Sequence, residues 1–168
     1  MEIRDALKEQ LHAGLGMLRQ CVERCPDDLW TAGEHPRTYW RVAFHVVYFT
    51  HLYLGQGEDA FVPWPGRTAD TAGMWQRPWD LEPYELPGDA AVATPAQMLA
   101  YLAFVDGLVD TTVDGLDLDS DESGFSWYQK VSKLSHELLN LRHLQGHVGQ
   151  LSELLMARGI DIDWISKA

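Results

Sequence analysis

The sequence predicts an all-α protein, a four-helix bundle with a long crossover between helices 2 and 3. Three observations lead to this prediction. Four stretches place apolar residues at helical spacing, no stretch alternates apolar and polar residues as a strand does, and a segment rich in proline and glycine separates the second stretch from the third. A chain of 168 residues can bury one complete core. We therefore expect a single domain over residues 1–168.

The first two helices are recognised by their apolar faces and by the residues that end them. From Ile3 to Cys25, apolar residues recur at spacings of three and four, and Pro26 ends the pattern. The second pattern covers Tyr39–Leu54 and closes at Gly55. Its sequence, YWRVAFHVVYFTHLYL, is apolar around most of its circumference, which predicts burial on several sides, within the bundle or against a second subunit. On this ground we expect a homodimer.

Residues 55–92 form the predicted crossover. Prolines and glycines occur there too densely for a long helix. The segment also contains Trp64, Trp75 and Trp79, and indole rings generally need burial or a ligand to cover them. We expect an ordered segment that covers one end of the bundle.

Capping residues mark the last two helices. The sequence TPAQ at residues 94–97 combines a threonine N-cap, a proline at the first helical position and a glutamine that completes a capping box. This helix is expected to reach Leu116. The last helix is expected over residues 132–158, with Gly159 as its C-terminal glycine cap. A short apolar tail, residues 160–165, is expected to pack back onto the bundle.

The charge of the chain argues against some classes of partner. The 25 acidic residues outnumber the 13 basic ones, which gives a formal net charge of −12 at pH 7. Binding to phosphate backbones and anionic lipids depends on Lys and Arg, so we expect neither nucleic acid nor membrane as a partner. The first residues lack the basic and apolar regions of a secretory signal, and no apolar run approaches 18 residues. We therefore expect a cytoplasmic protein.

The last helix contains a pair of histidines that can meet at one ion. His143 and His147 are four residues apart, so they project from the same face with about 5–6 Å between their Cβ atoms. Asn140 and Gln150 fall within the same narrow stripe. By itself, a His-x-x-x-His pair is more often two surface or core histidines than a metal site.

A third histidine changes that balance. His45 lies in the middle of the most apolar helix, where an uncompensated buried polar group costs about 1–3 kcal/mol. Metal coordination would satisfy one ring nitrogen, and a hydrogen-bond acceptor beside the site would satisfy the other. Leu139 and Leu154 bound the stripe of His143, so we expect that stripe to face the core and to meet His45.

His45, His143 and His147 therefore predict a site for one divalent transition metal. No fourth protein ligand is evident, which is typical of open catalytic sites, and both zinc and nickel suit imidazole ligands. A zincin protease is excluded because HLQGH lacks the glutamate of HExxH. A ferritin-like di-iron site is disfavoured because only Glu9-x-x-His12 fits its motif.

The other histidines rank lower. His136 is seven residues before His143 and near the same stripe, which makes it a candidate for supporting the ligands, although a capping or solvent-exposed role is favoured. We interpret His12, His35 and His51 as surface or packing residues.

These segments resemble the DinB/YfiT-like superfamily of bacterial four-helix bundles. The resemblance rests on the histidine in the middle of YWRVAFHVVYFTHLYL and on the His-x-x-x-His and Gly-Gln steps of ELLNLRHLQGHVGQLSELL. It covers most of the chain in helix order but no motif in the crossover or in the acidic loop, residues 117–126. It implies a DinB-like fold with the metal triad on His45, His143 and His147, and no DNA polymerase activity.

The resemblance implies more than one function. Some members are metal-dependent transferases or isomerases that use low-molecular-weight thiols such as bacillithiol or mycothiol, and we expect a thiol S-transferase of this kind, with a small-molecule substrate, in detoxification or stress response. Trp64, Trp75 and Trp79 are candidates for lining its pocket, although structural packing explains them equally well. The alternatives are a non-catalytic metal- or ligand-binding stress protein, and a hydrolase that uses metal-activated water, for which the sequence places no carboxylate as general base.

Overall fold

The computed structural model describes residues 2–34, 37–66 and 91–168. The regular secondary structure of these residues is helical, with no β-strand among them. The elements are α1 (Ile3–Glu23), α2 (Asp27–Trp30), α3 (Tyr39–Leu54), the short 3₁₀ helix η1 (Glu58–Ala60), α4 (Pro95–Gly115) and α5 (Lys133–Met156). The all-α prediction is therefore confirmed. Most of the predicted crossover, with Trp75 and Trp79, lies outside the described residues, and so does His35.

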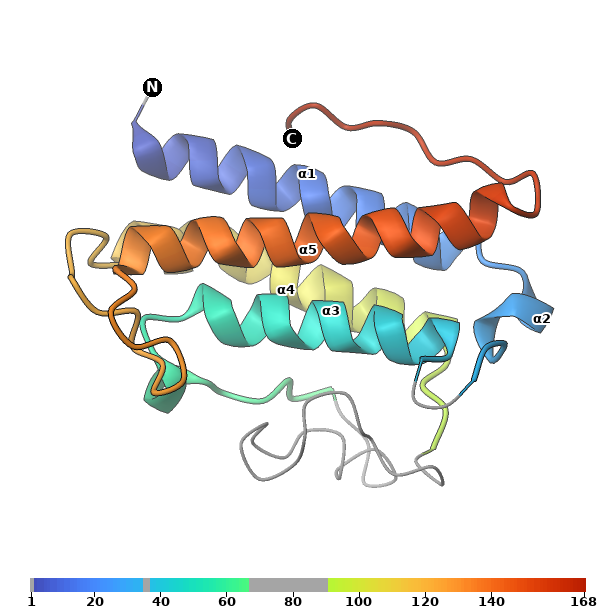
Figure 1. The fold of residues 1–168 in the computed structure, drawn as a ribbon, viewed down its shortest axis with the longest axis horizontal. Helices are drawn as coiled ribbons and strands as arrows, with labels where there is room; N and C mark the ends of the chain where they lie inside the picture. The colour runs from blue at the N-terminus through green and yellow to red at the C-terminus, as the bar shows by residue number, and fades with distance from the viewer. Residues whose placement is uncertain (1, 35–36, 67–90) are drawn as a thin grey trace.

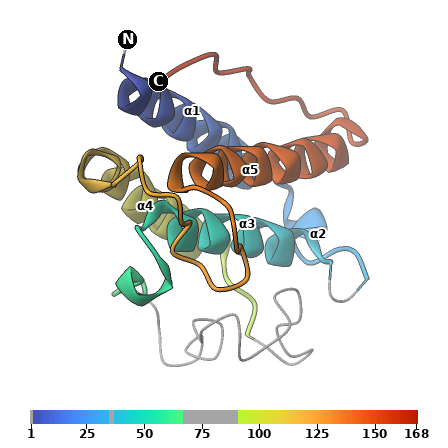
Figure 2. The same ribbon diagram turned by 60° about the vertical axis from the view of Figure 1, so that its left-hand side comes forward.

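The four long helices lie side by side, as Figures 1 and 2 show. α1 packs against α4 and α5, and α3 packs against the same two helices. Apolar side chains from all four fill the space between them, with Leu11 and Leu18 of α1, Val105 of α4 and Leu144 of α5 almost completely buried. α1, α4 and α5 thus each contribute one apolar stripe to a common core, as amphipathic periodicity requires.

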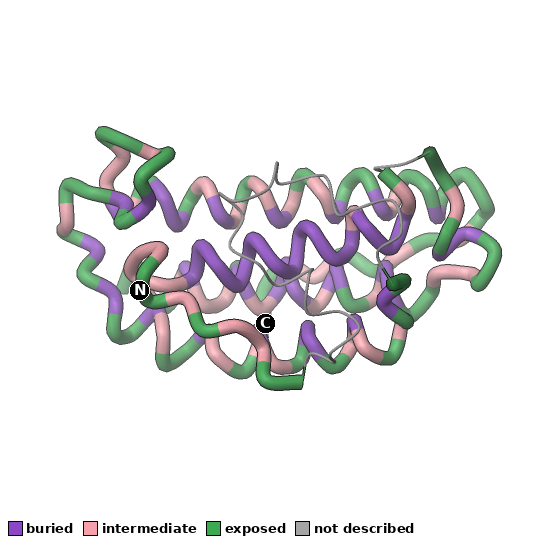
Figure 3. The backbone as a smooth tube through the Cα atoms, turned by 90° about the horizontal axis from the view of Figure 1, so that it is seen from below, coloured by how far each residue is buried: buried purple, intermediate pink, exposed green. Residues whose placement is uncertain are grey.

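α3 is the most completely buried helix, and Figure 3 shows it buried along nearly its whole length. Of its 16 residues, all but Val42 are buried. This explains the apolar circumference seen in the sequence, because α3 is enclosed within a single chain. The circumference of α3 therefore no longer argues for a second subunit.

The predicted caps are present. Thr94 and Gln97 form the capping box of α4, with the Gln97 N–H donating to Thr94 Oγ1 at 3.2 Å and the Thr94 N–H donating to Gln97 Oε1 at 2.9 Å. After α5, Gly159 has a φ of +75°, and Ile160 N–H donates to Leu155 O at 3.0 Å, which is the Schellman pattern. The positive φ explains why glycine stands there.

A short helix and the C-terminal tail pack against the four long helices. The short helix α2 was not predicted, and it places Trp30 so that its Nε1–H donates to Ala93 O at 2.8 Å. The C-terminal tail returns along α1, where Asp163 N–H donates to Gln20 Oε1 at 2.8 Å, so the predicted packing of the tail is confirmed. Among the described residues, none of the helices has the length and apolar character needed to cross a membrane.

Candidate metal centre

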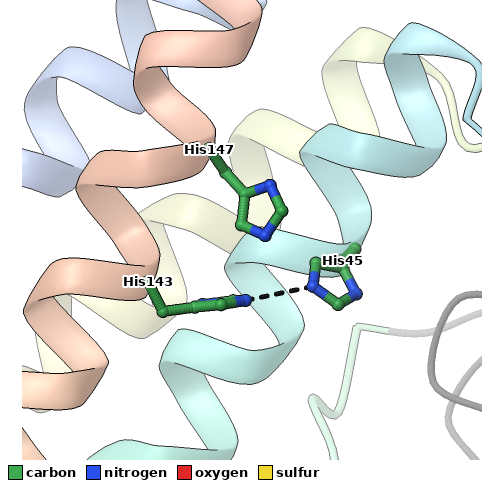
Figure 4. A group of neighbouring side chains, drawn as sticks. All are labelled: His45, His143 and His147. Atoms are coloured by element: carbon green, nitrogen blue, oxygen red, sulfur yellow. Dashed lines mark hydrogen bonds between the residues drawn. The ribbon is translucent and has the colours of Figure 1, made fainter.

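The antiparallel pairing of α3 with α5 brings the three predicted ligands together. Near the end of α3, Lys133 Nζ donates to Gly55 O, and further along Asn140 Nδ2 donates to Thr50 O at 3.3 Å. Continuing in this register, His45 comes level with His143 and His147, and Figure 4 shows the three imidazoles turned toward one another. The site is therefore a product of helix register as well as of helical spacing.

The three side chains are close enough to bind the same ion. The Nε2 atoms of His45 and His143 are 3.0 Å apart. The ring centroid of His45 lies 5.1 Å from that of His143 and 4.8 Å from that of His147, and the centroids of the two α5 rings are 4.5 Å apart. One ring nitrogen from each residue can be chosen so that all three lie within 4.8 Å of one another.

This geometry fits a first-row divalent metal. Zn–N bonds of about 2.0–2.1 Å in a tetrahedron place ligand nitrogens about 3.3 Å apart, so only small side-chain movements would close these three rings on one ion. Three neutral imidazoles without a carboxylate make a donor set that suits zinc and nickel equally well. The three ligands leave at least one coordination position for a further ligand.

The site lies at the boundary between core and solvent. His45 is 9% exposed, whereas His143 and His147 are both partly exposed. The stripe meets His45 as predicted, and Asn140 on it is fully buried, but the expectation that it faces the core throughout was wrong at its edge, where Leu154 is 44% exposed. The buried stripe of α5 runs one residue further round the helix, through Leu144, Val148, Leu151 and Leu155. The candidate metal ligands of α5 stand beside this stripe and are partly exposed to solvent.

The pKa values of His143 and His147 favour the neutral imidazole, which is the form that binds a cation. Burial, with a smaller contribution from His147, lowers the pKa of His143 to about 4. Burial also lowers the pKa of His147, helped by the charge of Arg37 and opposed by the hydrogen bond to Gln150. Both imidazoles are therefore neutral at pH 7, so no proton has to leave before they bind a metal.

Groups around the ligands set their orientation. His147 Nδ1 pairs with Gln150 Oε1 at 2.8 Å, and since that oxygen can only accept, Nδ1 carries the proton and Nε2 keeps the lone pair. On the inner side, the rings of Phe49 and Tyr53 pack against His143, with centroids 5.9 and 6.1 Å away. These rings were not singled out from the sequence, where they read only as apolar core.

His136 does not have the solvent-exposed role favoured from the sequence. It is fully buried, stacked on Phe125 with centroids 4.5 Å apart and an angle of 18° between the rings. Beside it, Lys133 Nζ and Glu137 Oε1 form an ion pair at 2.9 Å in which both side chains are fully buried. The i, i+4 spacing of opposite charges was the available sequence signal, but such pairs usually lie on exposed faces.

The remaining histidines take packing and surface roles, as predicted for those inside the described residues. His51 is buried, with Nδ1 2.9 Å from the hydroxyl of Tyr101. His12 is partly exposed and lies 2.6 Å from Asp106. Trp64 stacks on Tyr101 with centroids 5.2 Å apart, a packing contact with α4 that leaves its predicted pocket role unsupported.

Comparisons with protein-family models, with characterised proteins and with solved structures find no match to this chain. The function is therefore argued from the site itself.

Proposed function

We propose that the chain binds one divalent transition metal, zinc or nickel, through His45, His143 and His147, and uses it in a metal-dependent transfer of a low-molecular-weight thiol. One observation carries the proposal: nitrogens from two antiparallel helices converge to within 4.8 Å at a place that solvent reaches. An open three-histidine arrangement of this kind is typical of catalytic rather than structural sites, which close all four positions with protein ligands.

The residues around the site have distinct tasks in this proposal. The three histidines hold the ion, and Gln150 keeps the lone pair of His147 Nε2 turned toward it. Phe49 and Tyr53 exclude water from the inner side of His143. A metal held there lowers the pKa of a coordinated thiol and keeps it as thiolate, the form that attacks electrophiles. Because all three protein ligands are neutral, they leave the charge of the ion uncompensated, which favours an anionic fourth ligand.

The proposal includes a fold family. We assign the four packed long helices to a four-helix bundle of the DinB/YfiT-like superfamily, with the crossover between α3 and α4. Support comes from the order of the elements, from the position of His45 in the middle of α3, and from the His143 and His147 pair followed by Gln150 on α5.

Metal content tests the first half of the proposal. Elemental analysis of purified wild-type protein is expected to give one equivalent of zinc or nickel per chain, and His143→Ala is expected to lose most of it. His12→Ala is the matched control, because it removes a histidine of α1 that pairs with Asp106. Equal metal content in wild type and His143→Ala would refute the triad.

Activity tests the second half. Wild-type protein loaded with zinc or nickel is expected to accelerate the conjugation of bacillithiol, mycothiol or glutathione to a panel of electrophiles, measured as loss of free thiol. His143→Ala is expected to fall to the uncatalysed rate, with His12→Ala as control. Metal binding without acceleration of any conjugation would instead favour the non-catalytic metal-binding stress protein.

Two other predictions concern a hydrolase activity and the oligomeric state. The hydrolase alternative gains no support, because the metal-binding group found among the described residues contains no carboxylate to act as general base. The homodimer stays a prediction, and light scattering of the purified protein tests it.

A further inference from the structure

Two amide side chains flank the histidine pair of α5, one on each side and each three residues away. Gln150 follows His147 by three residues, and its Oε1 lies 2.8 Å from His147 Nδ1. Asn140 precedes His143 by three residues. Residues three apart on a helix are neighbours on its surface, so each amide is placed to serve the histidine next to it. Only the Gln150 contact is formed directly.

His143 needs an acceptor on its inner nitrogen. Its Nε2 faces His45 Nε2 at 3.0 Å, so Nε2 is the nitrogen that reaches the centre of the triad. An imidazole that binds a metal through Nε2 carries its proton on Nδ1. His143 Nδ1 is buried, and it has no hydrogen-bond partner within the part of the chain that the structure describes. A buried N–H without an acceptor is rare in folded proteins.

Asn140 has an acceptor to offer. The residue is fully buried, and its Nδ2 donates to Thr50 O at 3.3 Å. A carbonyl oxygen cannot donate, so the amide nitrogen must face Thr50, and this contact fixes which way the amide group points. Its other end, Oδ1, is buried and likewise has no partner among the described residues. The unused acceptor and the unused donor thus lie one helical turn apart.

We propose that Asn140 is a positioning residue whose Oδ1 accepts a hydrogen bond from His143 Nδ1–H and thereby holds His143 in the tautomer that presents the Nε2 lone pair to a metal. The two atoms would be joined directly or through a bridging water molecule. The inference rests on the proposed metal site, but on no particular reaction. In the metal-free protein it requires that His143 Nε2 accepts from His45 Nε2–H.

The main rival donor is the hydroxyl of Thr50. Thr50 is fully buried, and its Oγ1 also lacks a partner among the described residues. If Thr50 Oγ1–H were the donor to Asn140 Oδ1, the tautomer of His143 would not depend on Asn140. Thr50→Val removes the hydroxyl and keeps the size of the side chain, so it separates the two arrangements.

The tautomer of His143 in the metal-free protein is the first test, read at pH 7 from the ring ¹⁵N chemical shifts. Wild type, Thr50→Val and the conservative Asn140→Asp are expected to carry the proton on Nδ1. Asn140→Leu, which is similar in size but has no acceptor, is expected to shift the population toward Nε2–H. A wild-type His143 with its proton on Nε2, or an Asn140→Leu protein that keeps the proton on Nδ1, would overturn the inference.

Zinc affinity, measured by competition with a chromophoric chelator, is the second test. Loss of such a supporting hydrogen bond typically weakens metal binding by about 10–100-fold, and this is the expected effect of Asn140→Leu, with Asn140→Asp largely restoring affinity. If Asn140→Leu does not fold, the wild-type and Asn140→Asp tautomers still decide. A wild type that binds neither zinc nor nickel refutes the proposed function and leaves the tautomer result intact. Unchanged affinity and tautomer in Asn140→Leu refute only this inference.

Discussion

Polar side chains lie at two kinds of helix interface in this protein, and the two differ in burial. Between α1 and α4, His12 meets Asp106 and Asp110, and Lys8 meets Asp114, all at the rim, where the carboxylates are 49–70% exposed. Between α3 and α5, most polar groups are buried: Thr50, Lys133 and Asn140 are fully buried, and His143 and His147 are partly exposed. Several polar atoms there lack hydrogen bonds within the described part of the chain.

The difference indicates where the fold tolerates the free-energy cost of burying polar groups. Rim groups exchange water for a partner with little net effect on stability. Buried polar groups in a medium of low dielectric constant are costly unless every atom is satisfied, so a sequence that keeps them at the α3–α5 interface gives up stability there. The candidate metal ligands lie at that interface, and perturbed ionisable groups are often found where a protein carries out its function.

The largest expected effect is at the buried ion pair of α5. Glu137→Leu leaves Lys133 buried without its carboxylate and should lower the free energy of unfolding by about 3–5 kcal/mol. The double variant Lys133→Met with Glu137→Leu should recover much of this loss, because it removes both charges. Urea unfolding of the three proteins measures the effect, and a single variant as stable as wild type would contradict it.

Bound metal should stabilise the folded protein. At a free zinc concentration about 100 times the Kd, binding adds about 2.7 kcal/mol to the free energy of unfolding. Thermal unfolding with zinc and with a chelator measures this gain. His143→Ala should show no gain, while His12→Ala should gain as much as wild type; a zinc-dependent increase retained in His143→Ala would place the ion elsewhere.

Acid should destabilise the folded protein through the protonation of His51. Burial lowers its pKa from 6.5 to about 4, so between these values the unfolded chain binds the proton and the folded chain does not. Its contribution is complete above pH 6.5 and is lost as the pH falls to about 4, at up to about 1.4 kcal/mol per pH unit. Unfolding across this range in wild type and His51→Gln measures it; identical pH profiles would contradict the assignment.

The smallest effect is expected at the α1–α4 rim, and its pH dependence has the opposite sign. Burial lowers the pKa of His12, but its contacts with Asp106 and Asp110 outweigh this and raise it. The contribution of His12 is therefore present below pH 6.5 and is lost as the pH rises through its folded pKa. His12→Asn should cost less than about 1 kcal/mol in urea unfolding at pH 5.5, and a larger loss there would remove the contrast between the two interfaces.

Much of this arrangement could be read from local sequence. The bounds of α3 were predicted as observed, because the apolar run and Gly55 mark both ends. The capping box at Thr94 and the glycine cap at Gly159 were also predicted, since caps depend on a few neighbouring residues. The exposure of Leu154 was not, because an apolar residue can be exposed without a large cost.

What the sequence determined by itself is therefore the four long helices and the identity of three candidate ligands, because each can be recognised within its own stretch of sequence. The tertiary structure bore out the expected meeting of His45 with His143 and His147. It alone decided that His136 is buried and that Asn140 reaches Thr50. Each of these depends on the register of α3 against α5. That register is set by the packing of side chains distant in sequence, which helical periodicity does not contain.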